Sequence, residues 1–329
     1  MGSLPELLRL VVEERRELTR DVVLLALAAP DGSALPGYDA GAHVTVTAPS
    51  GRRPSYSLAE AGSTAPRRYV IAVRRSEVAL GGRGGSVSLH DDVRVGHQLE
   101  VTPPRNAFAL LPARRYVLIA GGIGITPVRA MAQELRARGD AAVEVLYLTR
   151  DAASTPFLEE MTADGAVVHH SAGSTGSSGG AGRGRLDLWP WLAEPDDDAR
   201  VYCCGPTALL DEVRALTVHW RPSRVHVEEF AGVDATGIGA EPFTAVWEPT
   251  GERVEVPADR SLLAALRGAG LPVDGDCEAG TCGTCRLRLV AGEAHHRDVV
   301  LDEGERAGAV MPCVSRAVSE ELVVAPPVR

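Results

Sequence analysis

Four cysteines in the last fifth of the chain have the residue type and spacing of iron ligands. Cys277, Cys282 and Cys285 follow one another as C-x4-C-x2-C, and Cys313 stands further on, after a strand-like run at residues 286–290. This is the plant-type arrangement for a 2Fe-2S cluster, in which four thiolates hold two bridged irons. We expect these four cysteines to be the metal ligands of the protein.

Glycines around these cysteines favour the same interpretation. Gly275, Gly280 and Gly283 leave the backbone free to pass close to a cluster and to present amide groups to its sulfurs. A structural zinc is one alternative, but zinc sites usually pair two short cysteine knuckles, whereas here one loop supplies three ligands and the fourth stands alone. Four buried, inert thiols are the other alternative.

A basic strand and a glycine-rich loop in the first hundred residues could hold a flat heterocycle and its phosphate. Residues 52–58 read RRPSYSL. A guanidinium can bind a phosphate through two hydrogen bonds, and a Tyr ring can lie against a flat ring system. Residues 81–88 read GGRGGSVS, in which consecutive glycines expose backbone amides and Ser86 adds a hydroxyl, as suits a phosphate monoester. A plain glycine hairpin turn is the alternative for this loop.

Two further glycine turns in the middle of the chain have the composition of a dinucleotide site. Residues 121–127 read GGIGITP between an apolar strand and a helix expected after Pro127. Glycines at a strand end let a dinucleotide approach the backbone, and a helix N-terminus favours its pyrophosphate. The G-x-G-x-x-G fingerprint itself is absent. Residues 202–206 read YCCGP, for which two core cysteines at a strand end are the alternative.

The apolar pattern predicts the elements that position these groups, beginning with an antiparallel barrel. The first hundred residues are short runs separated by Gly, Pro and Asp, and those at 43–47, 56–58 and 68–74 alternate with a period of two. Such alternation is typical of half-buried antiparallel strands. We predict a Greek-key β-barrel at residues 1–111.

An α/β domain with a parallel sheet is expected next, at residues 112–231. Apolar runs at 116–120 and 143–148 enclose a helix-like stretch at 127–138, and this strand, helix, strand order predicts parallel strands. The Ser- and Gly-rich tract at 171–184 cannot hold a packed element and is expected to be a surface loop.

The four cysteines belong to a third predicted domain, residues 242–329, which follows a linker at 232–241. Strands are expected at 243–247 and 253–256. A helix should open after Ser261, whose hydroxyl can cap its first turn.

Composition limits the class of protein. The chain has 329 residues, enough for two or three domains, and 45% of them are hydrophobic. There is no apolar run of about 18 residues, and residues 1–20 alternate leucines with Glu and Arg. We therefore expect no membrane span, no signal peptide and a cytoplasmic location. The net charge of −10 argues against nucleic acid or an anionic membrane as a partner.

The C-terminal motifs resemble those of the phthalate dioxygenase reductase family. The similar stretches are CEAGTCGTC at residues 277–285, HRDVVL at 296–301 and PCVSRA at 312–317. The resemblance implies a β-grasp fold around the cluster, preceded by a flavin-binding barrel and a nicotinamide-binding domain of the ferredoxin reductase type.

In that family the barrel carries an R-x-Y-S motif and a phosphate loop, which RRPSYSL and GGRGGS resemble. Here Pro54 stands two residues before Tyr56, where the family has Arg, so Arg53 or Arg83 would bind the phosphate. FMN is expected rather than FAD, because no segment obviously receives an adenine. The residues that the resemblance assigns to flavin binding are His43, Arg53, Tyr56, Ser57, Leu58, Ala72, Val73, Arg74, Arg83, Gly84, Gly85 and Ser86.

The two glycine turns are similar to the GGxGxTP and CGP turns of ferredoxin reductase-like domains. The resemblance implies that Thr126 approaches the flavin, Cys204 lies beside the nicotinamide and Phe230 stacks on the flavin, and these three are the expected catalytic residues; a core Phe is the alternative for Phe230. Asp151, where the ribose should be read, disfavours a 2′-phosphate, while Arg150 would favour one, so we expect NADH rather than NADPH. The expected nicotinamide-binding residues are Gly121, Gly122, Ile123, Thr126, Thr149, Arg150, Asp151, Cys204, Gly205 and Pro206.

Electron counting sets the expected order of the cofactors. NADH gives up two electrons together, whereas an iron-sulfur cluster accepts one at a time, so FMN must stand between them. The resemblance implies a monomeric reductase whose partner is a terminal oxygenase, either Rieske-type or a cytochrome P450. The alternatives are a non-catalytic redox sensor or binding module, and a flavin reductase that acts directly on a small substrate.

Overall fold

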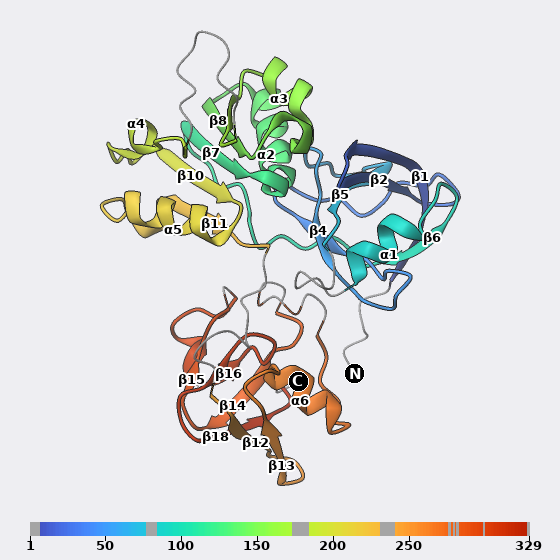
Figure 1. Cartoon of the computed structure of the whole chain (residues 1–329), viewed down its shortest axis with the longest axis vertical. Coiled ribbons are helices and arrows are strands. Elements are labelled where there is room, and N and C mark those ends of the chain that lie inside the picture. The colour runs from blue at the N-terminus through green and yellow to red at the C-terminus, as the bar shows by residue number, and fades with distance from the viewer. Residues whose placement is uncertain are drawn as a thin grey trace. The chain divides into compact units, whose positions relative to one another are not determined.

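The computed structural model describes residues 7–76, 84–172, 184–230, 241–275, 278, 280, 283–298 and 300–327. The chain divides into two compact units, one of residues 4–230 and one that includes residues 231–329 (Figure 1). Apart from Glu241, the expected linker at 232–241 lies outside the described residues. The three domain boundaries therefore stay predictions.

The first part of the larger unit is an antiparallel barrel. Its strands are β1 (Leu8–Thr19), β2 (Val22–Ala28), β3 (His43–Thr45), β4 (Ser55–Ser57), β5 (Arg68–Arg74) and β6 (Gln98–Val101). Four of them form a sheet in the order β5-β2-β1-β6, and β3 pairs with β4. Isolated bridges from Val46 to Val101 and from Leu58 to Ile71 join this hairpin to both edges of the sheet. The sheet thus closes, which confirms the predicted Greek-key barrel.

The glycine loop after β5 differs from its prediction, because residues 85–88 are helical. Helix α1 (Gly85–Asp91) begins after Gly84, whose φ of 85° is in the left-handed region that glycine adopts readily. Leu89 and Val93, four residues apart, are both buried in the barrel core. Burial of Leu89 within α1, together with Val93 just beyond its end, explains why a segment so rich in Gly and Ser folds as a helix. Gly81, Gly82 and Arg83 lie outside the described residues.

The second part of the larger unit has a parallel sheet with helices on both faces, as predicted. The strands are β7 (Arg115–Gly121), β8 (Ala142–Thr149), β9 (Val167–His170), β10 (Ala199–Cys204) and β11 (Val225–Glu228), in the order β11-β10-β7-β8-β9. The helices are α2 (Ile125–Arg138), α3 (Leu158–Ala163), α4 (Trp189–Leu192) and α5 (Thr207–Leu216). Three short 3-10 turns accompany them: η2 (Gly122–Gly124), η3 (Ala152–Ser154) and η4 (Pro222–Arg224). The strand order reverses between β7 and β10, and such a switch point opens a crevice at the carboxyl ends of the two strands.

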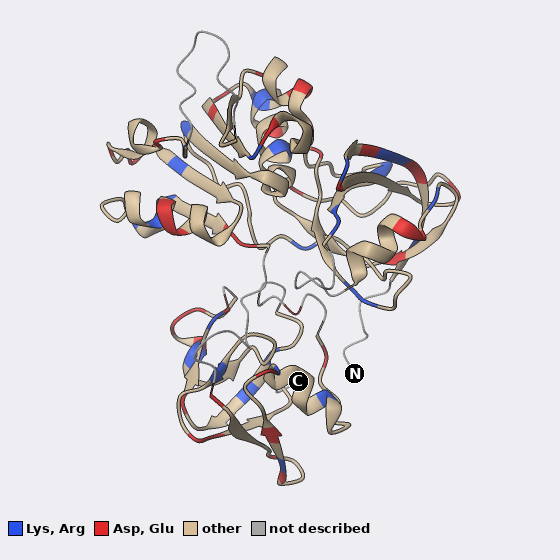
Figure 2. Ribbon diagram, viewed as in Figure 1, with Lys and Arg blue, Asp and Glu red and all other residues tan. Residues whose placement is uncertain are grey.

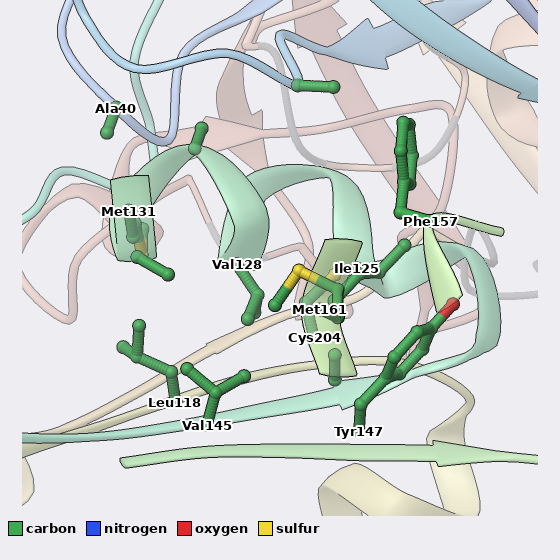
Figure 3. Close-up of a cluster of buried hydrophobic side chains, with 14 of the residues drawn as sticks. Ala40, Leu118, Ile125, Val128, Met131, Val145, Tyr147, Phe157, Met161 and Cys204 are labelled. Carbon is green, nitrogen blue, oxygen red and sulfur yellow. The ribbon is translucent and has the colours of Figure 1, made fainter. Parts of the chain in front are cut away.

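Helix α2 begins at Ile125, two residues before the predicted stretch at 127–138. A proline is tolerated in the first turn of a helix because its missing N–H would have no helical partner there. Figure 3 shows Val128 and Met131 of α2 above Leu118 and Val145 of the sheet, and Ile125 nearer to Cys204 and Tyr147. The same hydrophobic cluster includes barrel residues, so barrel and parallel sheet share a core.

The smaller unit confirms the predicted β-grasp fold. Its strands are β12 (Phe243–Trp247), β13 (Glu252–Val256), β14 (Leu287–Ala291), β15 (Ala294–His295), β16 (Ala309–Val310), β17 (Arg316–Ala317) and β18 (Glu321–Ala325), with helix α6 (Leu262–Gly268) and the turn η5 (Glu305–Ala307). The main sheet has the order β13-β12-β18-β14-β16, and β12 runs parallel to β18. The Ser261 hydroxyl accepts a hydrogen bond from the Ala264 amide at 3.2 Å, which is the predicted cap of α6.

Acidic and basic residues are interspersed on both units, as the alternating colours along β1 illustrate (Figure 2). Within the described part of the chain, no helix combines the length and the apolar character needed to cross a bilayer.

Candidate functional site

Two of the four predicted iron ligands are described, and they lie together. The Cys285 and Cys313 sulfurs are 3.2 Å apart, with 3% and 4% of the residues exposed. This separation is too long for a disulfide, which measures about 2.0 Å, and two thiolates so close would bind the same iron. Cys277 and Cys282 lie outside the described residues, and within those described no three potential ligands gather.

The backbone around these cysteines leaves room only for glycine. Gly280 and Gly283 have φ of 74° and 77°. A Cβ atom at Gly280 would lie 2.7 Å from Val314 Cγ2, and one at Gly275 would lie 3.2 Å from the Cβ of Cys285. Gly280 is thereby held against Val314, the residue that follows Cys313. Buried thiols beside a tightly wrapped glycine loop fit a 2Fe-2S cluster.

The HRDVVL run supports this loop from the other side. The Asp298 carboxylate is buried and accepts hydrogen bonds from the amides of Val300 and Leu301 at 3.2 and 2.8 Å. A Cβ at Gly280 would lie 3.3 Å from the Asp298 Cα. The motif that carried the family resemblance therefore packs directly on the cluster loop.

The predicted flavin strand belongs to the β3-β4 hairpin, which has one polar face. His43 pairs with Ser57 and Thr45 with Ser55 across the two strands, and the hydroxyl oxygens of Thr45 and Ser55 are 2.9 Å apart. Tyr56 lies on the opposite face against the barrel core, where burial raises the pKa of its phenol. The hairpin thus has a row of buried polar side chains on one face and, on the other, a phenol that stays neutral.

The two segments predicted to bind the flavin phosphate meet in space. A Cβ at Gly85 would lie 3.2 Å from the ring of Pro54, and the Ser88 hydroxyl donates to the Ser50 hydroxyl at 3.1 Å. Pro54, which replaces the family's Arg, therefore fills the contact with the start of α1. The Ser86 hydroxyl accepts from the Ser76 amide at 3.0 Å.

The remaining predicted flavin residues are placed in different surroundings. The side chains of Leu58 and Val73 belong to the barrel core. The Leu58 amide donates to the Ala42 carbonyl at 2.8 Å, and the Val73 carbonyl oxygen lies 2.8 Å from His90 Nε2. Ala72 points instead into the cluster shared with the parallel sheet. The Arg74 guanidinium is 3.5 Å from the Asp21 carboxylate and mostly exposed.

The two predicted nicotinamide turns are in direct contact at the switch point of the sheet. A Cβ at Gly124 would lie 2.1 Å from the Cys204 carbonyl oxygen, and one at Gly121 would lie 2.7 Å from Pro206 Cδ. A Cβ at Gly205 would lie 3.0 Å from the Gly121 Cα. Both turns need glycine because their backbones pack against each other.

Three of the predicted nicotinamide-binding residues place polar side chains at or near this end of the sheet. The Thr126 hydroxyl, in the first turn of α2, donates to the Ile123 carbonyl at 3.2 Å. At the end of β8, Thr149 Oγ1 lies 2.7 Å from His170 Nδ1. Hydrogen bonds from Ser154 lower the pKa of Asp151, so this carboxylate is ionised at neutral pH.

One residue beside Cys204 was not predicted to belong to the site. Glu228 pairs with Cys204 across β10 and β11, and its Oε2 lies 3.9 Å from the Cys204 sulfur. Burial raises the pKa of Glu228 to about 8 and that of the Cys204 thiol well above its usual range. Both groups are therefore neutral at pH 7. Cys203 faces the opposite side of the sheet, in the cluster under α5.

Glu228 could not be found by sequence reasoning because a single Glu in a strand is normally solvated. The predicted stacking residue Phe230, two residues further on, is 36% exposed. β11 ends at Glu228, two residues before Phe230.

Comparison with known proteins gives consistent matches. Residues 245–318 match the family model of the 2Fe-2S iron-sulfur cluster binding domain, and residues 118–215 match that of the oxidoreductase NAD-binding domain. The chain is 42% identical to phthalate dioxygenase reductase of Burkholderia cepacia over 96% of this chain and 97% of that protein. A solved structure of phthalate dioxygenase reductase has a TM-score of 0.74 at 41% identity and covers 97% and 98% of the two chains. An intact type IV self-sufficient cytochrome P450 monooxygenase also has a TM-score of 0.74, at 35% identity, over 97% of this chain and 41% of that one.

Proposed function

Because this chain belongs to the phthalate dioxygenase reductase family, we propose that it is the reductase component of an oxygenase system. It takes electron pairs from NADH and delivers single electrons to a terminal oxygenase. The observation that carries this proposal is the presence, in one polypeptide, of two glycine turns packed together at the switch point of a parallel sheet and of two buried thiols 3.2 Å apart.

When bound, FMN accepts an electron pair and the 2Fe-2S cluster accepts single electrons, which is the chemistry that amino acids cannot supply. The chain contributes orientation and exclusion of water. Gly121 and Gly205 allow the dinucleotide to reach the backbone at the switch point, and the N-terminus of α2 favours its pyrophosphate. Cys204 presents a small, neutral sulfur beside the nicotinamide. Cys285 and Cys313 hold iron together with Cys277 and Cys282.

The barrel binds FMN through the hairpin and α1. The small polar face of His43, Thr45 and Ser57 receives the ring, while Phe230 covers its other side. Arg53 is the arginine we propose for the phosphate, since it precedes Pro54, which contacts the start of α1. Charge attraction and two-pronged hydrogen bonding suit a guanidinium to this role.

NADH is the proposed donor because an ionised Asp151 opposes a 2′-phosphate. The proposed partner is a separate Rieske-type oxygenase, since identity is higher to the dioxygenase reductase, at 42%, than to the P450 fusion, at 35%. We also propose that the protein is a monomer. Its proposed location is the cytoplasm, because thiolate ligands persist in a reducing compartment.

A single substitution separates this function from direct reduction of a small substrate. Cys313→Ser should abolish NADH-driven reduction of cytochrome c, which needs the cluster, while NADH oxidation with a two-electron quinone as acceptor continues from the flavin. Cys203→Ser, a buried cysteine under α5, is the matched control and should keep both activities. Cytochrome c reduction at the wild-type rate by Cys313→Ser would contradict the proposal.

A further inference from the structure

Three polar side chains on one face of α2 hydrogen-bond to the backbone of the barrel. Arg129 donates to the Ala59 carbonyl. The Ala61 amide donates to Gln133 Oε1 at 3.1 Å. Glu134 Oε2 accepts from the amides of Ala40 and Gly62 at 3.0 and 3.3 Å. We call Arg129, Gln133 and Glu134 the α2 clamp.

The clamp is anchored on the side of the parallel sheet as well. Arg129 Nε donates to Glu160 Oε1 at 2.8 Å, and its guanidinium lies 4.7 Å from the centre of the Phe157 ring. Gln133 Nε2 donates to the same Glu160 oxygen at 3.1 Å. Only 12% of the Arg129 side chain is exposed. A guanidinium fixed in this way has one orientation, unlike a lysine on its flexible stem.

The barrel atoms that the clamp holds adjoin the predicted flavin residues. Ala59 directly follows Leu58 at the end of the RRPSYSL strand, and Ala40 lies three residues before His43. The contact is tight: a Cβ at Gly62 would lie 2.9 Å from Glu134 Oε2. The clamp therefore contacts the segment that precedes β3 and the segment that follows β4.

The N-terminal end of α2 belongs to the predicted nicotinamide turn. Arg129 follows Thr126 by three residues, which is about 5 Å along a helix axis. Between the hairpin and α2 the apolar contacts include Ala40 and Ala59, and contacts between small apolar groups have no preferred direction. Hydrogen bonds are directional, so those of the clamp fix one position of α2 relative to the hairpin.

We propose that Arg129, supported by Gln133 and Glu134, is a positioning residue that sets the separation between the flavin strand and the nicotinamide turn. The inference rests on the proposed function. Hydride transfer needs reacting atoms about 3–3.5 Å apart, and a displacement of about 1 Å can slow such a step about 100-fold. The residues that the clamp contacts all lie outside the predicted cofactor-binding sets.

Arg129→Lys tests the clamp, with Arg136→Lys as the matched control. Arg136 lies on the same helix and donates to the Asp164 carboxylate at 2.6 Å and to the Asp164 carbonyl at 2.6 Å, so its bonds stay within the parallel-sheet domain. In a stopped-flow experiment, NADH should reduce the flavin of Arg129→Lys about 10 to 100 times more slowly than the flavin of the wild-type protein. The deuterium isotope effect on this rate should be larger in the variant. Flavin content and the affinity for NADH should stay within about twofold of wild type, since Arg129 contacts Ala59, Phe157 and Glu160 and none of the predicted cofactor-binding residues. Arg136→Lys should match wild type.

Amide hydrogen exchange gives a readout that does not depend on turnover. Ala61 and Gly62 should exchange faster in Arg129→Lys and in the milder variant Gln133→Met, which serves if the first does not fold. If the variants reduce their flavin at the wild-type rate, or if Arg136→Lys is slowed equally, the positioning role of Arg129 is wrong while the proposed function stands. If NADH does not reduce the flavin of the wild-type protein, the proposed function fails as well.

Discussion

Replacing Glu228 by Gln should remove a loss of stability that the wild-type protein suffers as pH rises. Burial raises the pKa of Glu228 from 4.5 to about 8 in the folded chain. The unfolded chain therefore releases this proton at a lower pH than the folded chain does. The contribution of Glu228 to the free energy of unfolding is therefore largest below pH 4.5 and falls as the pH rises toward 8. Above pH 8 it does not fall further.

The size of the effect follows from the two pKa values. Each pKa unit corresponds to 1.36 kcal/mol, which gives a total of at most about 5 kcal/mol. Between pH 6 and pH 8 the expected loss is about 2 kcal/mol. For a unit the size of residues 4–230, this corresponds to a shift in Tm of about 4–8 °C.

Thermal unfolding of the cofactor-loaded protein at pH 6, 7 and 8 measures this loss. The Tm of Glu228→Gln minus that of wild type should widen by about 4–8 °C over this range, because all other titrating groups cancel in the difference. Glu229→Gln is the control, since Glu229 accepts a hydrogen bond from the Thr207 hydroxyl rather than facing Cys204; its difference from wild type should stay constant. A Glu228→Gln difference that does not change with pH would refute the reasoning.

Three further outcomes are expected. Gly124→Ala should weaken NADH binding at least about tenfold in a fluorescence titration, because its Cβ would lie 2.1 Å from the Cys204 carbonyl oxygen and force the two turns apart; unchanged affinity would contradict the contact. Ser261→Ala should cost the smaller unit about 1 kcal/mol, seen as a Tm lower by about 4 °C, because the Ala264 amide loses its cap. Asp151→Ser should raise kcat/KM for NADPH about tenfold relative to NADH; an unchanged ratio would show that the ribose is recognised elsewhere.

The chemistry of the protein could be predicted from sequence wherever its residues are neighbours in the chain. The cysteine spacing, the GGIGITP turn and the CGP turn each lie within ten residues, and β12 and the Ser261 cap were predicted at the positions observed. Alternation alone also identified the barrel, although β2 is buried on both faces. Helix α1 was not predicted because Gly and Ser are typical of loops, and the burial of Leu89 that stabilises the helix is not visible in the sequence.

What could not be predicted depends on distant partners. Arg129 meets the Ala59 carbonyl across 70 positions of sequence, and Cys204 meets Glu228 across 24. In the sequence Arg129 reads as one of many exposed arginines and Glu228 as an ordinary acidic residue. Only the closed barrel and the strand order of the parallel sheet bring these pairs together.

The most direct test of the account is an anaerobic titration with NADH, followed by visible absorbance and electron paramagnetic resonance on the same sample. We predict that about 1.5 equivalents of NADH fully reduce the protein, since FMN takes two electrons and the cluster takes one, and that the resonance of a reduced 2Fe-2S cluster appears in step. Complete flavin bleaching with about one equivalent, and no iron-sulfur resonance at any point, would contradict the claim that electrons leave this protein through iron.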